Sequence, residues 1–151
     1  MIKHIKCDIF ESGADIICHQ VNCQGVMGSG IAKQVREKYP IVYEKYKEYC
    51  NAAKTGLLGK VLIIPTKDGF SIANLFGQAY YGYDGACYTD YVYLRECLKY
   101  VRGFSLNKTI AIPYKIGCAR GGGDWNIVYK IIEEVFADSD CEVLICEYNG
   151  G

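Results

Sequence analysis

The chain has 151 residues, half of them hydrophobic, so it is long enough and apolar enough to bury one core. Its 17 basic and 17 acidic residues cancel, and a net charge of zero argues against nucleic acid as a partner, because that usually needs a broad basic face. No apolar stretch approaches the roughly 18 residues of a membrane span, and the first residues run directly into a strand pattern, so we expect neither a membrane segment nor a signal peptide.

The pattern in the first half of the chain predicts two strands followed by two helices. Residues 2–10 alternate as a strand that ends at Asp8-Ile9-Phe10, and the apolar run 15–21 predicts a buried second strand. A loop with three glycines follows at 22–30. Residues 31–39 predict a helix that Pro40 ends, and 41–52 predict another, with Tyr43, Tyr46 and Tyr49 as a half-buried packing stripe.

The second half predicts a hairpin and then an alternation of helices and strands. Its expected elements are a hairpin of 60–65 and 70–76, a tyrosine-rich loop at 77–89, a helix to 102 capped by Asp90, a strand at 109–113, a glycine loop at 116–123, a helix at 124–136 and a strand at 142–147. Within the last helix we expect Trp125, Val128, Ile132 and Val135 to be buried. This order predicts an α/β fold with a mixed sheet that helices cover on both faces.

Nine cysteines form an odd set with no C-x-x-C pair, and several fall inside expected strands. We interpret them as reduced thiols that fill core volume in a cytoplasmic protein. Only two histidines are present, without the spacing of metal ligands, so we expect no metal site and no cofactor.

The two glycine loops share one pattern, in which an apolar strand leads through glycines into a helix start. Glycine lacks a Cβ, so backbone N–H groups can close on a ligand, and the helix start adds free donors and a partial positive charge. One such loop alone could be a plain tight turn. Two at the carboxyl ends of neighbouring strands favour a ligand with a pyrophosphate and a sugar. Neither loop has the Walker A or the dinucleotide-binding glycine pattern.

Several stretches together resemble a macrodomain, a module that binds ADP-ribose. They are Cys7 to Phe10, His19 to Asn22, Val26 to Ala32, Ala73 to Gln78, and Ile112 to Trp125, in family order. The resemblance implies a single macrodomain over 1–151, a three-layer α/β/α fold with a central mixed six-stranded sheet. The most similar branch holds hydrolases that remove terminal ADP-ribose from acidic side chains, an ADP-ribose-1″-phosphate phosphatase, and antitoxins that remove ADP-ribose from DNA.

The resemblance also implies the binding roles of individual residues. Asp8 accepts a hydrogen bond from the adenine amino group beside the Ile9 N–H, and Tyr148 packs against adenine. Asn22 faces the distal ribose near C1″. The second loop wraps the pyrophosphate with Ile116, Gly117, Cys118, Ala119, Arg120, Gly121 and Gly122. The first loop holds phosphate and distal ribose with Val26, Met27, Gly28, Ser29, Gly30 and Ile31.

The catalytic residues of the family are less completely matched in this chain than its binding residues. Hydrolases of the terminal type use a lysine and an aspartate, which fall here at Gln78 and Gly121. Glutamine cannot act as the attacking amine, which argues against the covalent route. The catalytic candidates are then Asn22, His19 and Gln78. His19 could instead be a histidine buried in the core. Four further residues near the loops are interpreted as structural. We expect Asp90 and Asp124 to cap helices and Cys23 and Cys118 to pack against neighbouring side chains.

We therefore expect a monomer whose partner is ADP-ribose, or an ADP-ribosylated protein or metabolite. It hydrolyses a 1″-linked group by a positioned water, from a protein ester, ADP-ribose-1″-phosphate or O-acetyl-ADP-ribose. The alternative is a non-catalytic module that reads or sequesters ADP-ribose. A third function, removal of ADP-ribose from DNA, is disfavoured by the zero net charge and the absent lysine. The tyrosine-rich loop could close over the ligand or face a partner.

Overall fold

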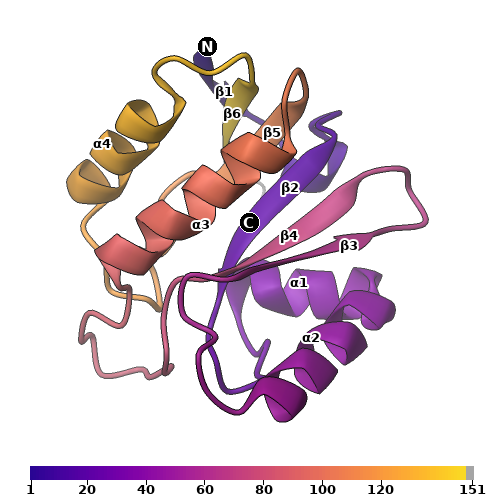
Figure 1. The fold of residues 1–151 in the computed structure, drawn as a ribbon, viewed down its shortest axis with the longest axis vertical. Helices are drawn as coiled ribbons and strands as arrows, with labels where there is room; N and C mark the ends of the chain where they lie inside the picture. The colour runs from indigo at the N-terminus through magenta and orange to yellow at the C-terminus, as the bar shows by residue number, and fades with distance from the viewer. Residues whose placement is uncertain (149–151) are drawn as a thin grey trace.

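The computed structural model describes residues 1–148, and its centre is a mixed six-stranded sheet (Figure 1). The strand order is β1-β6-β5-β2-β4-β3. β3 pairs antiparallel with β4, and every other neighbouring pair is parallel. The strands are β1 (Ile2–Lys6), β2 (Ile16–Val21), β3 (Val61–Pro65), β4 (Ser71–Phe76), β5 (Thr109–Pro113) and β6 (Glu142–Glu147).

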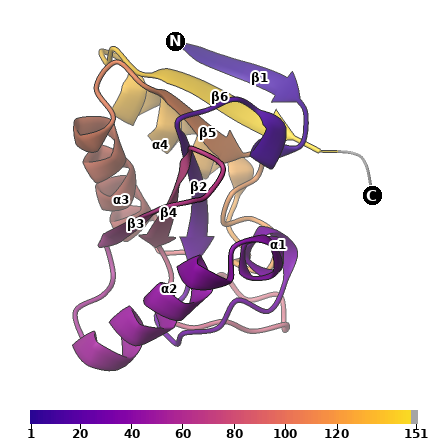
Figure 2. The same ribbon diagram turned by 90° about the vertical axis from the view of Figure 1, so that its right-hand side faces the viewer.

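Helices cover both faces of this sheet, α1 and α2 on one side and α3 and α4 on the other (Figures 1 and 2). Their bounds are α1 (Gly30–Lys38), α2 (Pro40–Ala53), α3 (Tyr91–Phe104) and α4 (Trp125–Phe136). This arrangement confirms the predicted α/β class, the mixed six-stranded sheet and the order of the elements along the chain.

β2 divides its side chains between the two cores because successive residues of a strand point to opposite faces. Ile16 and Cys18 pack in the cluster beneath α3 and α4, and Ile17 and Val21 pack in the cluster beneath α1 and α2. By the same alternation, His19 points to the α1 side and Gln20 to the α3 side. Two consecutive polar residues at the end of β2 thus reach different parts of the molecule.

Three helix starts follow the sequence signals. Asp90 accepts from the N–H groups of Val92 and Tyr93, and Asp124 accepts from the N–H of Asn126, so both aspartates are caps as predicted. Pro40 ends the first helix and is itself the first residue of α2, where its missing N–H costs nothing.

The first strand is shorter than predicted, because it ends at Lys6 instead of continuing to Phe10. Residues Ile9–Glu11 form a short 3₁₀ helix, η1, and the Asp8 carboxylate caps it by accepting from the Phe10 N–H at 3.0 Å. A local side-chain bond of this kind competes with strand pairing, which is why the alternating pattern misled the prediction.

Two expectations about aromatic residues also need correction. Tyr43 and Tyr49 are partly buried as expected, but Tyr46 is fully buried and its hydroxyl bonds to Asn22. Val128, Ile132 and Val135 are buried as predicted, whereas Trp125 remains partly exposed at the start of α4.

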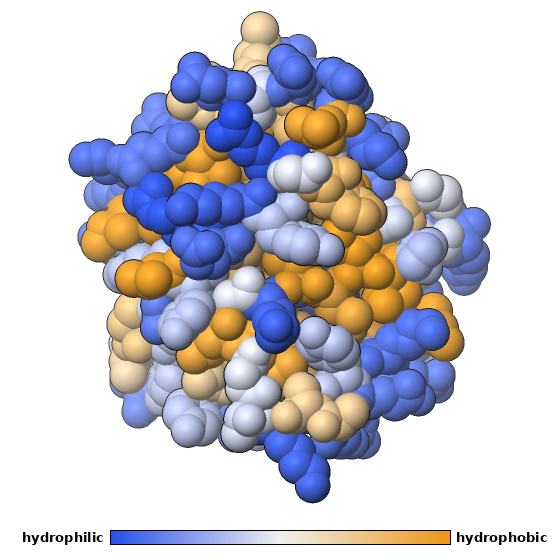
Figure 3. Space-filling view, in the orientation of Figure 1, coloured by the Kyte–Doolittle hydropathy of each residue, from blue (hydrophilic) through white to orange (hydrophobic). Residues whose placement is uncertain are grey.

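All nine cysteines are free thiols, and five of them are buried in the core as predicted, whereas Cys7, Cys23 and Cys118 are partly buried and Cys87 is exposed. In the face shown by Figure 3, apolar residues gather beside α3, over β3 and β4, where the edge strand leaves Val61, Leu62 and Ile63 only partly buried. Within residues 1–148 the helices are all too short or too polar to cross a membrane.

Candidate functional site

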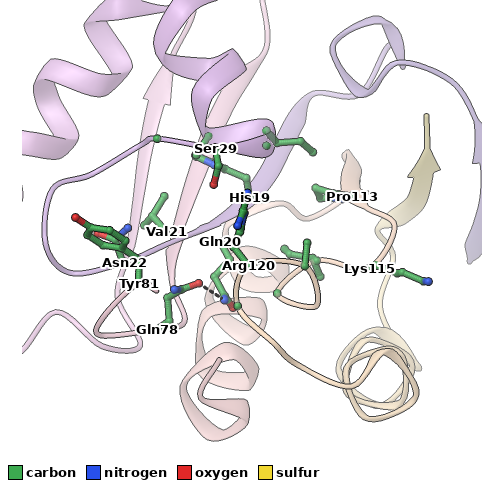
Figure 4. Close-up of a pocket in the computed structure, with 18 of the residues that line it drawn as sticks. His19, Gln20, Val21, Asn22, Ser29, Gln78, Tyr81, Pro113, Lys115 and Arg120 are labelled. Atoms are coloured by element: carbon green, nitrogen blue, oxygen red, sulfur yellow. Dashed lines mark hydrogen bonds between the residues drawn. The ribbon is translucent and has the colours of Figure 1, made fainter. Parts of the chain in front are cut away.

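The two glycine loops lie beside each other because the strands before them, β2 and β5, are parallel neighbours. A cavity of about 300 Å³ opens between the first glycine loop (22–30) and the second (116–123). Its other walls are the end of β2 and the residues 77–89 after β4, which we call the strap (Figure 4). The cavity is where ligands of open α/β sheets bind, beyond the carboxyl ends of the strands.

Most residues predicted from the sequence line this cavity, but not all. Those in the lining are His19, Asn22, Val26, Gly28, Ser29, Gly30, Ile31, Gln78, Ile116, Gly117, Ala119, Arg120 and Gly121. Those outside it are Asp8, Ile9, Met27, Cys118, Gly122 and Tyr148. Met27 is fully buried beneath the first loop, and Tyr148 is largely exposed after β6. The adenine contacts of Asp8, Ile9 and Tyr148 stay predictions.

Asn22 holds the first glycine loop in shape through hydrogen bonds of both polar atoms of its side chain. Its Oδ1 accepts from the Gln24 N–H at 3.0 Å, from the Val26 N–H at 3.4 Å and from the Tyr46 hydroxyl at 2.9 Å. Its Nδ2 donates to the Val26 carbonyl at 2.9 Å. One amide hydrogen is left to meet a ligand, so Asn22 mainly holds the loop in position.

The start of α1 faces the cavity with its backbone donors uncapped. Ser29 stands at the cap position but makes no side-chain capping bond, in contrast to Asp90 and Asp124. The first N–H groups of a helix have no intrahelical acceptor and carry a partial positive charge. Gly30 begins the helix with φ of 57°, a conformation that favours glycine. This end of α1 is therefore suited to an anion.

The glycines of the second loop allow the strap to approach closely, as well as a ligand. The Gly121 carbonyl accepts from the N–H groups of Tyr88 and Thr89, at 2.7 and 3.0 Å. A Cβ on Gly121 would lie 2.6 Å from the Thr89 hydroxyl, and one on Gly122 would collide with the Ala86 carbonyl oxygen. Gly122 was predicted as a ligand contact, and here its missing side chain makes room for the strap.

Gln20 ties the strap to the second loop, a role that sequence reasoning missed. Its Nε2 donates to Gln78 Oε1 at 2.8 Å, the bond drawn in Figure 4, and to the Thr89 hydroxyl at 2.9 Å. Thr89 in turn donates to the Gly117 carbonyl at 2.6 Å. Gln78 is held at both ends, because its Nε2 donates to the Tyr80 carbonyl at 2.7 Å.

His19 lies at the floor of the cavity, only 2% exposed. Its Nε2 lies 2.7 Å from Asn74 Oδ1, and Asn74 Nδ2 donates to the Leu62 carbonyl. Since Asn74 presents its oxygen to the ring, Nε2 carries the hydrogen and Nδ1 keeps a lone pair. That Nδ1 is buried without a partner among residues 1–148. Burial lowers the pKa of His19 to about 4, so the ring is neutral at neutral pH.

This depressed pKa predicts a loss of stability in mild acid. The unfolded ring has a pKa near 6.5, above the folded value of about 4, so the unfolded chain binds the extra proton. The contribution of His19 is complete above pH 6.5 and falls as the pH drops toward 4. Urea unfolding at pH 7 and pH 5 should show wild type losing about 2 kcal/mol more than His19→Gln. Equal losses in both proteins would contradict the buried neutral ring.

The charged side chains that line the cavity are Lys115 and Arg120, and within the described part of the chain no carboxylate joins them. The guanidinium of Arg120 lies over the ring of Tyr83, with Cζ 4.4 Å from its centroid. Burial raises the pKa of Cys23 and of Cys118 to about 11, which keeps both as thiols and agrees with packing roles. The cavity is therefore locally positive in a chain without net charge.

Comparison with known proteins gives several similarities. A DNA ADP-ribosyl glycohydrolase of Mycobacterium tuberculosis is 27% identical over 156 residues, covering 100% of this chain and 43% of the relative. An ADP-ribose 1″-phosphate phosphatase of Debaryomyces hansenii is 34% identical over 101 residues, covering 54% of this chain and 56% of the relative. These alignments span about half the length of those curated relatives.

Solved structures show the same fold. A Bacteroides thetaiotaomicron protein of unknown function is 27% identical with a TM-score of 0.85, covering 97% of this chain and 98% of that one. Thermosipho africanus DarTG, solved in complex with ADP-ribose, is 20% identical with a TM-score of 0.81, covering 97% of this chain and 41% of that one. The family model described as Macro domain matches residues 18–132, from within β2 through both glycine loops into α4. The chain therefore belongs to the macrodomain family.

Proposed function

We propose that this chain binds ADP-ribose in the cavity between its glycine loops and hydrolyses a group linked at C1″. The observation that carries the proposal is the uncapped start of α1, which faces the second glycine loop across one cavity. Backbone N–H groups from two sides suit a diphosphate better than a single phosphate. Arg120 and Lys115 also line this cavity and add positive charge to it, with Lys115 at its β5 end.

The orientation of the ligand follows from the two ends of the cavity. Pro113 and Lys115 lie at the β5 end, whereas Asn22 and Tyr81 lie at the β2 end (Figure 4). Asp8, which is proposed to accept from adenine, follows β1 at the far side of the sheet from β4. The adenosine then extends toward β5 and β6, and the distal ribose lies near Asn22 and His19.

His19 is proposed as the acceptor that positions the reacting water. Its Nδ1 lone pair lacks a protein partner in the described residues, and a water or ribose hydroxyl would satisfy it. Attack of this water forms a new C1″–O bond while the old C1″–O bond breaks. The leaving group departs with the electron pair as a carboxylate or phosphate, and the proton of the water passes to His19 Nδ1. Gln78 stands where a lysine would be needed for covalent attack, which favours water as the nucleophile.

Turnover assays test this proposal directly. We would incubate the chain with ADP-ribose-1″-phosphate and with a protein ADP-ribosylated on aspartate, and measure the ADP-ribose released. We expect release from at least one of them, and a kcat about tenfold lower for His19→Gln, since a ring with so low a pKa is a weak base. Tyr39→Phe, which removes a hydroxyl bonded to Asp68 away from the cavity, serves as the matched control.

A non-catalytic reader is the second candidate, favoured by two features of the cavity. The Gln78 amide is already engaged at both ends, and no carboxylate lines the cavity within residues 1–148. Full retention of both substrates together with micromolar ADP-ribose binding would establish the reader and refute hydrolysis of these two substrates. The mycobacterial relative is named a DNA ADP-ribosyl glycohydrolase. An ADP-ribosylated oligonucleotide in the same assay therefore tests whether this chain removes ADP-ribose from DNA.

A further inference from the structure

The strap is fastened to both glycine loops. On the first loop, the Cys23 N–H donates to the Ala79 carbonyl and the Tyr81 N–H donates to Gln24 Oε1, both at 3.0 Å. On the second loop, the Gly121 carbonyl receives the N–H groups of Tyr88 and Thr89. Between these anchors the strap turns back on itself, with Gln78 paired to Thr89, and Gly82 and Tyr83 are the residues of 82–87 that line the cavity.

Tyr83 is the side chain that bridges the mouth. Its ring lies under the Arg120 guanidinium of the second loop. Its hydroxyl lies 3.9 Å from the position that a Cβ on Gly28 of the first loop would take. The Tyr81 ring supports it edge-on, with centroids 6.2 Å apart. Gly82 and Tyr83 both line the cavity, so the ring forms part of its wall.

The turn that carries Tyr83 is itself held in shape. Asp84 Oδ1 accepts from the Tyr88 hydroxyl at 2.7 Å and from the Ala86 N–H at 3.1 Å. Gly82 lies so close to the Tyr88 hydroxyl that any side chain there would collide with it. These bonds fix the backbone turn that follows Tyr83, whose ring is 62% exposed and is positioned by its contacts with Arg120 and Tyr81.

We propose that Tyr83 determines substrate specificity by restricting the group at C1″ to a small substituent of a free metabolite, such as a phosphate or an acyl ester. This inference rests on the proposed function, which puts the distal ribose at the Asn22 and Tyr81 end of the cavity. A substituent on C1″ must then leave through the opening that Tyr83 narrows between Gly28 and Arg120. A phosphate or acetyl group fits beneath the ring, whereas a polypeptide must displace it.

Binding measurements with a small and a large ligand test the restriction. Calorimetry would compare ADP-ribose with a peptide that carries ADP-ribose on a serine through C1″. For wild type we expect the peptide conjugate to bind at least tenfold more weakly than ADP-ribose. Tyr83→Ala should bring the two dissociation constants within about threefold of each other, and Tyr83→Phe, which keeps the ring, should retain the tenfold difference.

Tyr80→Ala is the matched control, because Tyr80 is an exposed tyrosine on the same strap that does not line the cavity. It should retain the wild-type difference. The inference fails if wild type binds both ligands equally, if Tyr83→Ala keeps the difference, or if Tyr80→Ala abolishes it as well. Absence of ADP-ribose binding would instead overturn the proposed function, and this inference with it.

Discussion

Replacing Asn22 with alanine is expected to weaken ADP-ribose binding about 100-fold, a loss of roughly 3 kcal/mol, because the first glycine loop loses the side chain that shapes it. Four hydrogen bonds disappear, and the hydroxyl of buried Tyr46 loses one of its two acceptors. The N–H groups at the start of α1 would then no longer be held in the geometry that a diphosphate requires. Calorimetric titration with ADP-ribose measures the effect.

Tyr46→Phe separates the loop-shaping role of Asn22 from any direct contact with the ligand. It removes only the hydroxyl that supports Asn22 from behind, 2.9 Å from Oδ1. We expect about tenfold weaker binding, with the loss of roughly one buried hydrogen bond. Tyr39→Phe loses a hydroxyl at the far end of α1 and should bind normally. An Asn22→Ala protein with wild-type affinity would contradict this account of the loop.

Alanine at Gly122 is expected to destabilise the fold by roughly 4 kcal/mol, from overpacking and left-handed backbone strain together. Gly122 has φ of 68°, and a Cβ there would collide with the Ala86 carbonyl and lie 3.0 Å from the Cys87 Cα. Because both neighbours are backbone atoms, the strap as a whole must move away from the second loop. Urea unfolding monitored by circular dichroism measures the change in free energy.

Gly69→Ala provides the matched control for backbone strain alone. Gly69 also has a positive φ, of 93°, but a Cβ there meets nothing within 4 Å. Its expected cost is about 1 kcal/mol, with ADP-ribose binding retained. Equal costs at the two positions would show that the contact between the strap and the second loop contributes nothing.

Local signals in the sequence were sufficient for most of the fold. Asp90 and Asp124 are caps whose partners lie two or three residues away, and Pro40 ends a helix through its own ring. The same reasoning failed at Asp8, where a local capping bond turned the chain although the alternating pattern continued. Short-range rules worked where one interaction dominated, and failed where two competed.

The interior of the site depends on pairs that are far apart in the chain. Tyr46 reaches Asn22 across 24 residues, and Gln20 reaches Thr89 across 69. No periodicity encodes these distances, so the tyrosine stripe suggested packing alone, and nothing in the sequence indicated which partners Gln20 would bond. The glycine pattern indicated the place where a cavity lies between the two loops, but it could not distinguish a glycine that lines the cavity from Gly122, which makes room for the strap.

Backbone amide chemical shifts during a titration with ADP-ribose test the central claim most directly. The account predicts saturable shifts concentrated in residues 26–32 and 117–121, with one midpoint for both groups, because a single diphosphate contacts both loops. Shifts confined to one loop, or shifts that leave both loops unchanged while another surface responds, would contradict it.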